Sequence, residues 1–316
     1  MEILNIILII FIVSSALFGI ASFFITAYVL FSIHLKRSKP EKWGRECSSD
    51  DPIQVAMYNE GLEWGEENEA FKKDVHIVNE GMNLYGEYFD FGYDKAVIMV
   101  PGRTEGLRYG YFFASVYKEK GYNVLAIDQR AHGKSDGKYN TIGFEEHKDI
   151  ISWAEFIHEK FCVKSIVLHG ICIGASCSMF ALVSDKCPSY LIGMVGEGIY
   201  PDFWESFKNH MIALKKPVEP FITLVNMWMK LFTGYTMKFG PKNVIDKMDK
   251  ALLMIHGKED LYSLPCEAEK LYEMSIAKPK NIVWVEKGAH SQLRHADKEK
   301  YDNAVRIFLD KIAIKQ

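Results

Sequence analysis

The sequence is poor in cysteine and has no excess of either charge. Six cysteines among 316 residues show neither a CxxC pair nor any other metal-ligand spacing, so a disulfide scaffold is excluded and a reducing compartment is favoured. Lys and Arg total 38 and Asp and Glu 41, a formal net charge of −3, which argues against a basic surface that binds nucleic acid. Metal, nucleotide and flavin motifs are also lacking. We therefore expect no cofactor and no nucleic-acid partner.

Charge is absent from one long stretch near the N-terminus. Residues 3–33 carry no charged side chain, and at about 1.5 Å per helical residue they exceed a hydrocarbon core of roughly 30 Å. A cleaved signal peptide would have a basic start and a shorter apolar core; a buried core helix is the other alternative. Basic residues follow the run, at Lys36, Arg37, Lys39, Lys42 and Arg45. By the positive-inside rule we expect a single-pass membrane protein whose folded domain is cytoplasmic.

The rest of the chain divides into a connector and a regular domain. We assign residues 1–34 to the transmembrane anchor, 35–70 to a connector without sustained periodicity, and 71–316 to the folded domain. Apolar strands are predicted at residues 75–78, 84–88, 96–100, 124–127, 166–169, 191–195, 252–255 and 282–285. Helices are predicted at residues 109–120, 144–160, 173–184, 265–274 and 298–314. Short apolar strands that alternate with helices predict an α/β fold with a mostly parallel sheet covered on both faces.

Chemically useful residues are expected just after the strands, because open parallel sheets carry their sites at the carboxyl ends of the strands. After the strand predicted at 166–169, a Gly-x-Cys-x-Gly turn spans residues 170–174, and a helix follows. This is the pattern of a nucleophile elbow, whose glycines let strand and helix approach closely while the central side chain projects. The helix N-terminus favours a thiolate and a developing oxyanion. Cys172 is therefore the candidate nucleophile.

Other strand ends supply an acid, a histidine and a backbone donor. Asp260 and His290 each follow a predicted strand. The chain order Cys172, Asp260, His290 is the nucleophile, acid and base order of the α/β-hydrolases. The backbone N–H of Arg103, which also follows a strand, would form an oxyanion hole with the N–H of Ile173.

Over about residues 75–312 the chain resembles the α/β-hydrolase superfamily, and most of all the bacterial membrane-anchored branch of serine-aminopeptidase-like and lysophospholipase-like hydrolases. The resemblance is carried by Asp-Gln-Arg-Ala-His-Gly-Lys-Ser at 128–135, the elbow at 170–174, His-Gly-Lys-Glu-Asp at 256–260 and Gly-Ala-His at 288–290. In two respects the chain departs from this family. The usual His-Gly pair of the oxyanion loop reads Pro101-Gly102 here, and the nucleophile is Cys, which resembles dienelactone hydrolases. The resemblance implies the α/β-hydrolase fold and gives Asp128 and His132 a structural role.

Each candidate residue has an alternative role. Cys172 is a residue type that also packs well in a core, as in a hydrolase that has lost its chemistry. His290 would otherwise be a surface histidine, and Asp260 a turn residue beside Glu259. The side chain of Arg103 either binds a substrate carboxylate or is solvated.

An insertion at about residues 199–248 separates two predicted strands. Apolar residues recur there at helical spacing, at Phe221, Leu224, Val225, Trp228, Leu231 and Phe232. This face predicts a small helical cap over the site or packing on the domain.

We expect a hydrolase that cleaves ester, lactone or thioester bonds of a small acyl or lipid-like substrate through a Cys-His-Asp triad and a thioester acyl-enzyme. Thiolate leaves more readily than an amine, which disfavours peptides. One alternative is a catalytically inactive binding module with this fold. The other is a redox-sensing thiol, for which neither Cys177 nor Cys162 is well placed as a partner.

Overall fold

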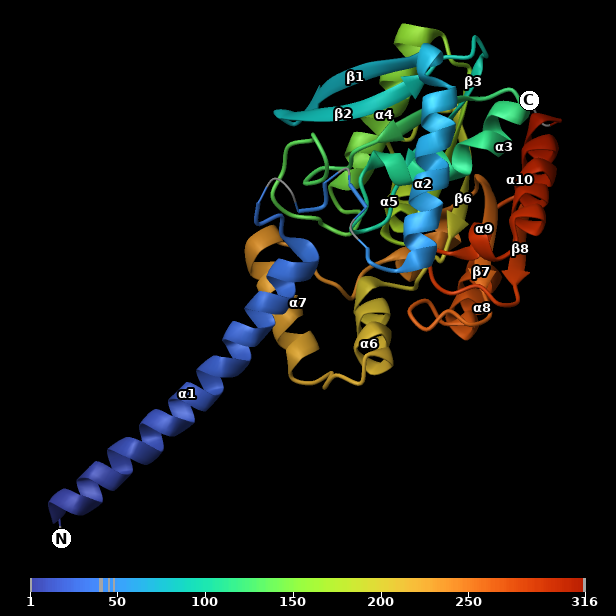
Figure 1. Cartoon of the computed structure of the whole chain (residues 1–316). Coiled ribbons are helices and arrows are strands. Elements are labelled where there is room, and N and C mark those ends of the chain that lie inside the picture. Colours follow the sequence, from blue (N-terminus) through green and yellow to red (C-terminus); the bar gives the residue numbers. More distant parts are fainter. Residues whose placement is uncertain (1, 40–41, 45, 48, 315–316) are drawn as a thin grey trace.

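A computed structural model describes residues 2–39, 42–44, 46–47 and 49–314, so Arg45 of the basic cluster lies outside the described residues. At the centre is an eight-stranded sheet with the order β1-β2-β4-β3-β5-β6-β7-β8 (Figure 1). The strands are β1 (Lys72–Asn79), β2 (Met82–Phe89), β3 (Lys95–Val100), β4 (Asn123–Ile127), β5 (Ser165–Ile171), β6 (Leu191–Glu197), β7 (Ala251–Gly257) and β8 (Lys280–Val285). The pairs β1–β2 and β2–β4 are antiparallel and the other five are parallel. The predicted fold class is confirmed, and each predicted strand is present.

Helices cover both faces of the sheet. Successive side chains of a strand point to opposite faces. In β3, Ile98 belongs to the core cluster that includes residues of α4, α5 and α8, and Met99 belongs to the cluster that includes residues of η2, α3 and α10. The bounds are η2 (Leu107–Phe113, a 3-10 segment), α3 (Ala114–Glu119), α4 (Glu146–Phe161), α5 (Ile173–Leu182), α8 (Pro265–Met274), α9 (Leu293–Ala296) and α10 (Lys298–Ala313).

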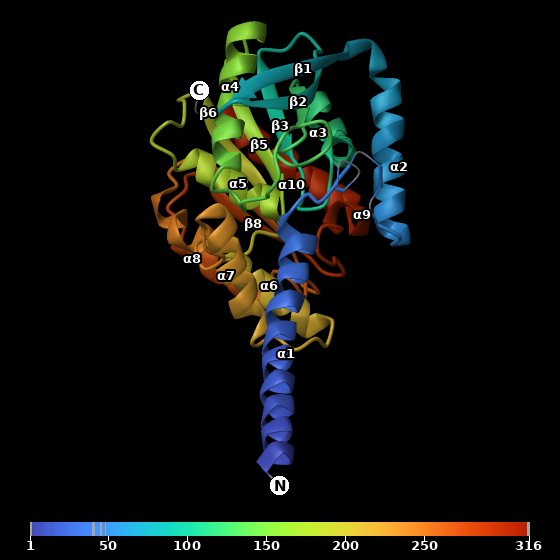
Figure 2. The same cartoon turned by 90° about the vertical axis from the view of Figure 1, so that its left-hand side faces the viewer.

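The predicted insertion contains helices that pack against the end of the N-terminal helix. These are α6 (Phe203–Ala213) and α7 (Phe221–Thr233). The insertion also contains η3 (Pro241–Asn243) and η4 (Ile245–Lys247), which pack near α8. Helix α1 (Glu2–Leu35) lies along α7, and its N-terminal part projects away from the rest of the molecule (Figures 1 and 2). Phe31 stacks on Phe232 with ring centroids 5.5 Å apart, and the indole N–H of Trp228 donates to the carbonyl of Phe24 at 3.1 Å. The last turns of α1 are therefore part of the folded core.

Helix α2 (Pro52–Glu67), followed by η1 (Glu69–Phe71), lies in the segment predicted to be a connector. The Asp51 carboxylate caps α2 by accepting the N–H of Ile53 at 2.8 Å. The buried face of α2 includes Gly61 and Gly65, and a Cβ at Gly65 would lie 2.8 Å from the ring of Tyr111. Because glycines stand beside Met57 and Tyr58 on this buried face, the apolar period in the sequence is weak there.

Other helices also differ from their predicted extents. The helix predicted at 109–120 is a 3-10 segment, η2, followed by the short helix α3. Helix α4 begins two residues later than predicted, at Glu146. The carboxylate of Glu146 accepts the N–H of Thr141 at 2.7 Å and that of Gly143 at 2.8 Å. The preceding residues therefore form a loop around this carboxylate.

Candidate active site

The turn between β5 and α5 holds Cys172 in a strained backbone conformation. Its φ is 53° and its ψ is −114°, a region that residues with a Cβ rarely adopt. The N–H of Cys172 donates to the carbonyl of Glu197 at 2.9 Å, which ties the turn to the end of β6. A Cβ at Gly174 would lie 2.1 Å from the carbonyl oxygen of Val100, and a Cβ at Gly170 would lie 2.5 Å from the carbonyl oxygen of Gly174. Glycine is required at both positions because strand and helix nearly touch.

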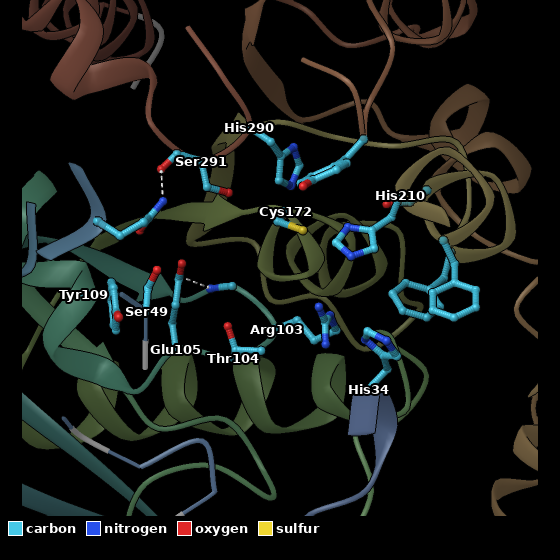
Figure 3. Close-up of a pocket in the computed structure, with 16 residues that line it drawn as sticks. His34, Ser49, Arg103, Thr104, Glu105, Tyr109, Cys172, His210, His290 and Ser291 are labelled. Carbon is cyan, nitrogen blue, oxygen red and sulfur yellow. Dashed lines mark hydrogen bonds between the residues drawn. The ribbon is translucent and has the colours of Figure 1, made fainter. Parts of the chain in front are cut away.

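Asp260 and His290 meet above this turn. Asp260 lies after β7 and His290 after β8, and the Nδ1 of His290 is 2.7 Å from the Oδ2 of Asp260. The other carboxylate oxygen of Asp260 accepts the N–H groups of Tyr262 at 2.8 Å and Ser263 at 2.9 Å. The acid is therefore fixed by backbone donors while it orients the imidazole. Figure 3 shows the ring of His290 beside Cys172.

The electrostatics of the three residues favour a charged pair. Burial lowers the pKa of His290, but the charges of Cys172 and Asp260 and hydrogen bonds to both residues raise it well above its usual value. Burial raises the pKa of Asp260, yet His290 and the backbone donors bring it below its usual value. The raised pKa of His290 beside the carboxylate of Asp260 favours the protonated form of this imidazole.

The loop after β3 lies beside Cys172 and His290. In the part of the chain that the structure describes, no hydrogen bond occupies the N–H of Arg103 or that of Ile173. The loop is held from two sides. The Oε2 of Glu105 accepts the N–H of Gly102 at 2.7 Å, and the Nε2 of His132 lies 2.6 Å from the carbonyl oxygen of Arg103. Burial raises the pKa of Glu105, although this N–H, His290 and Arg103 oppose the shift.

A cavity of about 330 Å³ joins these groups. Its lining includes the predicted residues Cys172, His290 and Arg103. Figure 3 shows two sides of the cavity: Arg103 lies with His34 and His210 on one, and Glu105 with Thr104 and Tyr109 on the other. Ile173 is buried behind Cys172, and Asp260 is buried behind His290.

Other sequence predictions concern residues outside the cavity. The carboxylate of Asp128 accepts the N–H groups of Leu107 and Lys134, each at 2.9 Å, and thus braces its turn as predicted. Cys177 is buried, and its sulfur contacts Gln129. Burial raises the pKa of Cys177 well above its usual value, so it is a poor partner for redox chemistry.

Several lining or supporting residues were missed by the sequence analysis. His34 comes from the end of α1 and His210 from α6 of the cap. Glu197 lies at the end of β6, and burial raises its pKa to about 7 despite donors from Tyr301 and Leu293. Only Glu197 had a sequence signal, because it closely follows the strand predicted at residues 191–195. The two histidines stand on helices whose docking no local pattern reveals.

Comparisons with known proteins agree with this fold. A family model described as alpha/beta hydrolase fold matches residues 95–217. YqkD of Bacillus subtilis, a protein described as uncharacterised, is 28% identical over 222 residues, which cover 68% of this chain and 71% of YqkD. The structure of the esterase Pf2001 from Pyrococcus furiosus matches with a TM-score of 0.67 and 23% identity, covering 87% of this chain and 99% of the esterase.

A further esterase, EaEST from Exiguobacterium antarcticum, matches with a TM-score of 0.56 and 16% identity, covering 75% of this chain and all of the esterase. The sheet order, the turn at Cys172 and these matches show that the chain has the fold of the α/β-hydrolase superfamily. Its similar solved structures include esterases.

Proposed function

We propose that the protein is a membrane-anchored hydrolase that cleaves ester, lactone or thioester bonds with Cys172 as nucleophile. The observation that carries this proposal is the strained turn at Cys172, next to a histidine that is hydrogen-bonded to a buried aspartate. Backbone strain at a non-glycine residue persists only where the surrounding structure enforces it, and it gathers at functional sites.

In the proposed mechanism, His290 and Asp260 generate the thiolate of Cys172, which attacks the carbonyl carbon. The oxyanion receives hydrogen bonds from the N–H groups of Arg103 and Ile173. His290 then protonates the leaving alcohol or thiol, and an acyl thioester remains on the sulfur. Water activated by His290 hydrolyses this thioester and returns the sulfur to its starting state.

The length of the part of α1 that precedes its ring contacts with the cap supports a membrane anchor. Among the described residues, the first ring of α1 that contacts α7 is that of Phe23, whose centroid lies 5.7 Å from that of Phe221. Before it, residues 2–22 are a helix of 21 residues, about 31 Å long at about 1.5 Å per residue. That matches a hydrocarbon core of about 30 Å. The exposed Lys215 and Lys216 follow α6 closely and fit the headgroup region.

The same packing speaks against a cleaved signal peptide. Ala27, Phe31 and Leu35 are fully buried in the folded core, and His34 lines the cavity. Cleavage within or after these turns would remove them from the domain. The proposal therefore predicts that the protein purified from membranes retains its N-terminus, which intact-mass spectrometry measures; a species that lacks residues 1–35 would contradict it.

Hydrolysis of p-nitrophenyl esters from acetyl to palmitoyl tests the activity. The full chain in detergent is compared with Cys172→Ala and Cys172→Ser, and with Cys266→Ala as a control at an exposed cysteine of α8. We expect turnover by the parent and by Cys266→Ala, none by Cys172→Ala, and slow turnover by Cys172→Ser because a hydroxyl is harder to ionise. Equal turnover by the parent and Cys172→Ala would exclude Cys172 as nucleophile. An inactive parent would favour the binding-module alternative.

A further inference from the structure

The side chain of Arg103 lines the cavity without a partner. No ion pair or hydrogen bond joins its guanidinium to any of the described residues, and it is only partly exposed. Burial lowers the pKa of Arg103, although Cys172, Tyr200 and Glu105 oppose the shift. A guanidinium withdrawn from water is costly unless an anion pairs with it. Arg103 therefore offers an unused anion-binding group beside the candidate nucleophile.

A second polar group on the same side is also unsatisfied. The Nδ1 of His34 is buried and has no hydrogen-bond partner in the described ranges. Its ring packs against Phe207, with centroids 5.0 Å apart, and faces His210 at 6.1 Å. Burial, followed by the charge of Arg103, lowers the pKa of His210 to about 4, so this ring is uncharged at neutral pH. Arg103 therefore lines this side of the cavity as a permanent positive charge.

The acidic residue of the cavity does not neutralise Arg103. Glu105 lies on the opposite side in Figure 3 and accepts the N–H of Gly102. In the described part of the chain, no ion pair joins Glu105 to Arg103. The cavity therefore has one side with an open cation and an unsatisfied imidazole nitrogen, and another where the carboxylate is already engaged.

We infer that this side of the cavity binds an oxyanionic group of the substrate, a carboxylate or a phosphate, which pairs with Arg103 and accepts a hydrogen bond from His34. The inference rests on the proposed function for its account of the substrate, an ester that carries such a group near the scissile bond. Arginine suits this role because its planar guanidinium donates two parallel hydrogen bonds to a carboxylate or phosphate.

Alkylation of Cys172 tests the site without requiring turnover. Iodoacetate and iodoacetamide are similar in size and differ in charge. Each alkylates sulfur as the S–C bond forms and iodide leaves. The ratio of their rates at Cys172 is measured by peptide mass spectrometry in the full chain, with the exposed Cys266 in the same sample as internal reference. His290 also attracts iodoacetate, so the deciding quantity is the change in the ratio caused by altering Arg103.

We expect Arg103→Met to lower the iodoacetate-to-iodoacetamide ratio at Cys172 by about tenfold, as for loss of one charge-assisted hydrogen bond, with no change at Cys266. Arg103→Lys keeps the positive charge but lacks the planar guanidinium, so its ratio should lie between those of the parent and of Arg103→Met. Arg108→Met is the control, because it removes a positive charge from the nearby segment η2, outside the lining of the cavity. An unchanged ratio in Arg103→Met, with thermal unfolding like that of the parent, would overturn the inference. If Arg103→Met does not fold, the ratio in Arg103→Lys decides. A ratio below that of the parent supports the inference, and an unchanged ratio overturns it.

The source of the anion and its link to catalysis are tested separately. Succinate and inorganic phosphate are compared as protectants of Cys172 against iodoacetamide, and stronger protection by one identifies the group. The p-nitrophenyl hemiester of succinate is then compared with p-nitrophenyl butyrate, and kcat/KM for the hemiester should be the more reduced by Arg103→Met. If Arg103→Met lowers kcat/KM equally for both esters, and neither anion protects Cys172, the proposed hydrolase activity is retained and the proposed anion site is rejected. If neither ester is hydrolysed, the proposed function fails and the alkylation ratio still decides the site.

Discussion

Gly198 lies against the side chain of His290, the candidate base. Substitution of Gly198 therefore tests whether the position of His290 affects activity. Gly198 follows β6 with a φ of +62°, and a Cβ there would lie 3.0 Å from the Cε1 of His290 and 3.2 Å from its Nδ1. These contacts are tighter than side chains ordinarily make, so the ring must move by a few tenths of an ångström. The ring is held by its 2.7 Å contact with Asp260. Gly198→Ala should therefore displace His290 relative to Cys172.

The expected loss of activity follows from the size of this displacement. Misplacement of a catalytic group by about 1 Å costs roughly 10²-fold in rate, so a shift of a few tenths predicts a fall in kcat of about tenfold. A non-glycine residue at positive φ costs a further 1 kcal/mol or so of stability. Gly81→Ala is the matched control, because Gly81 has a φ of +79° and a Cβ there would meet no atom within 4 Å.

The assay is ester hydrolysis by the full chain together with urea unfolding of both variants. Both should lose about 1 kcal/mol of unfolding free energy, and only Gly198→Ala should lose turnover. Equal kcat values in the two variants would refute the claim that the position of His290 limits the reaction.

Three further predictions concern the residues around the candidate nucleophile, Cys172. Asp260→Asn should lower kcat by about 10²-fold or more, because a neutral amide does not stabilise the imidazolium; steady-state kinetics measure it, and an unchanged kcat would remove Asp260 from the triad. The pKa of His290 is raised above its usual 6.5, so its contribution to stability is complete below about pH 6.5 and declines as the pH rises through the raised value. Urea unfolding of the parent and His290→Gln across this range should show a difference that shrinks with pH; a constant difference would contradict the charged pair. Glu105→Ala frees the N–H of Gly102 and should lower kcat by about tenfold by loosening the oxyanion loop, whereas Glu105→Gln, which keeps an acceptor, should lose less; equal losses would argue against this hydrogen bond as the cause.

The sequence predicted the sheet because each strand is a short apolar run next to a turn. It also brought Cys172, Asp260 and His290 forward as candidates, because residues that follow parallel strands share one edge of the sheet. The helix α2 escaped prediction, since its contact face contains Gly61 and Gly65, which carry no hydrophobic signal.

His34 and His210 could not be assigned from local patterns. They reach the cavity only because α1 docks on the cap, and that docking depends on contacts between residues about two hundred positions apart, such as Trp228 with Phe24. The sequence also could not show that the side chain of Arg103 has no ion-pair partner among the described residues. A sequence shows that an arginine follows a strand, but only the surrounding structure shows whether an acid lies within reach.

The central claim is that Cys172 forms a covalent thioester, and trapping this intermediate tests it most directly. The full chain is mixed with p-nitrophenyl acetate, quenched in acid within the first turnovers, digested and examined by mass spectrometry. The account predicts one acetyl group on the peptide that contains Cys172, removable by hydroxylamine, and none on that peptide in Cys172→Ala. Acetylation of another residue, together with turnover that persists in Cys172→Ala, would contradict it.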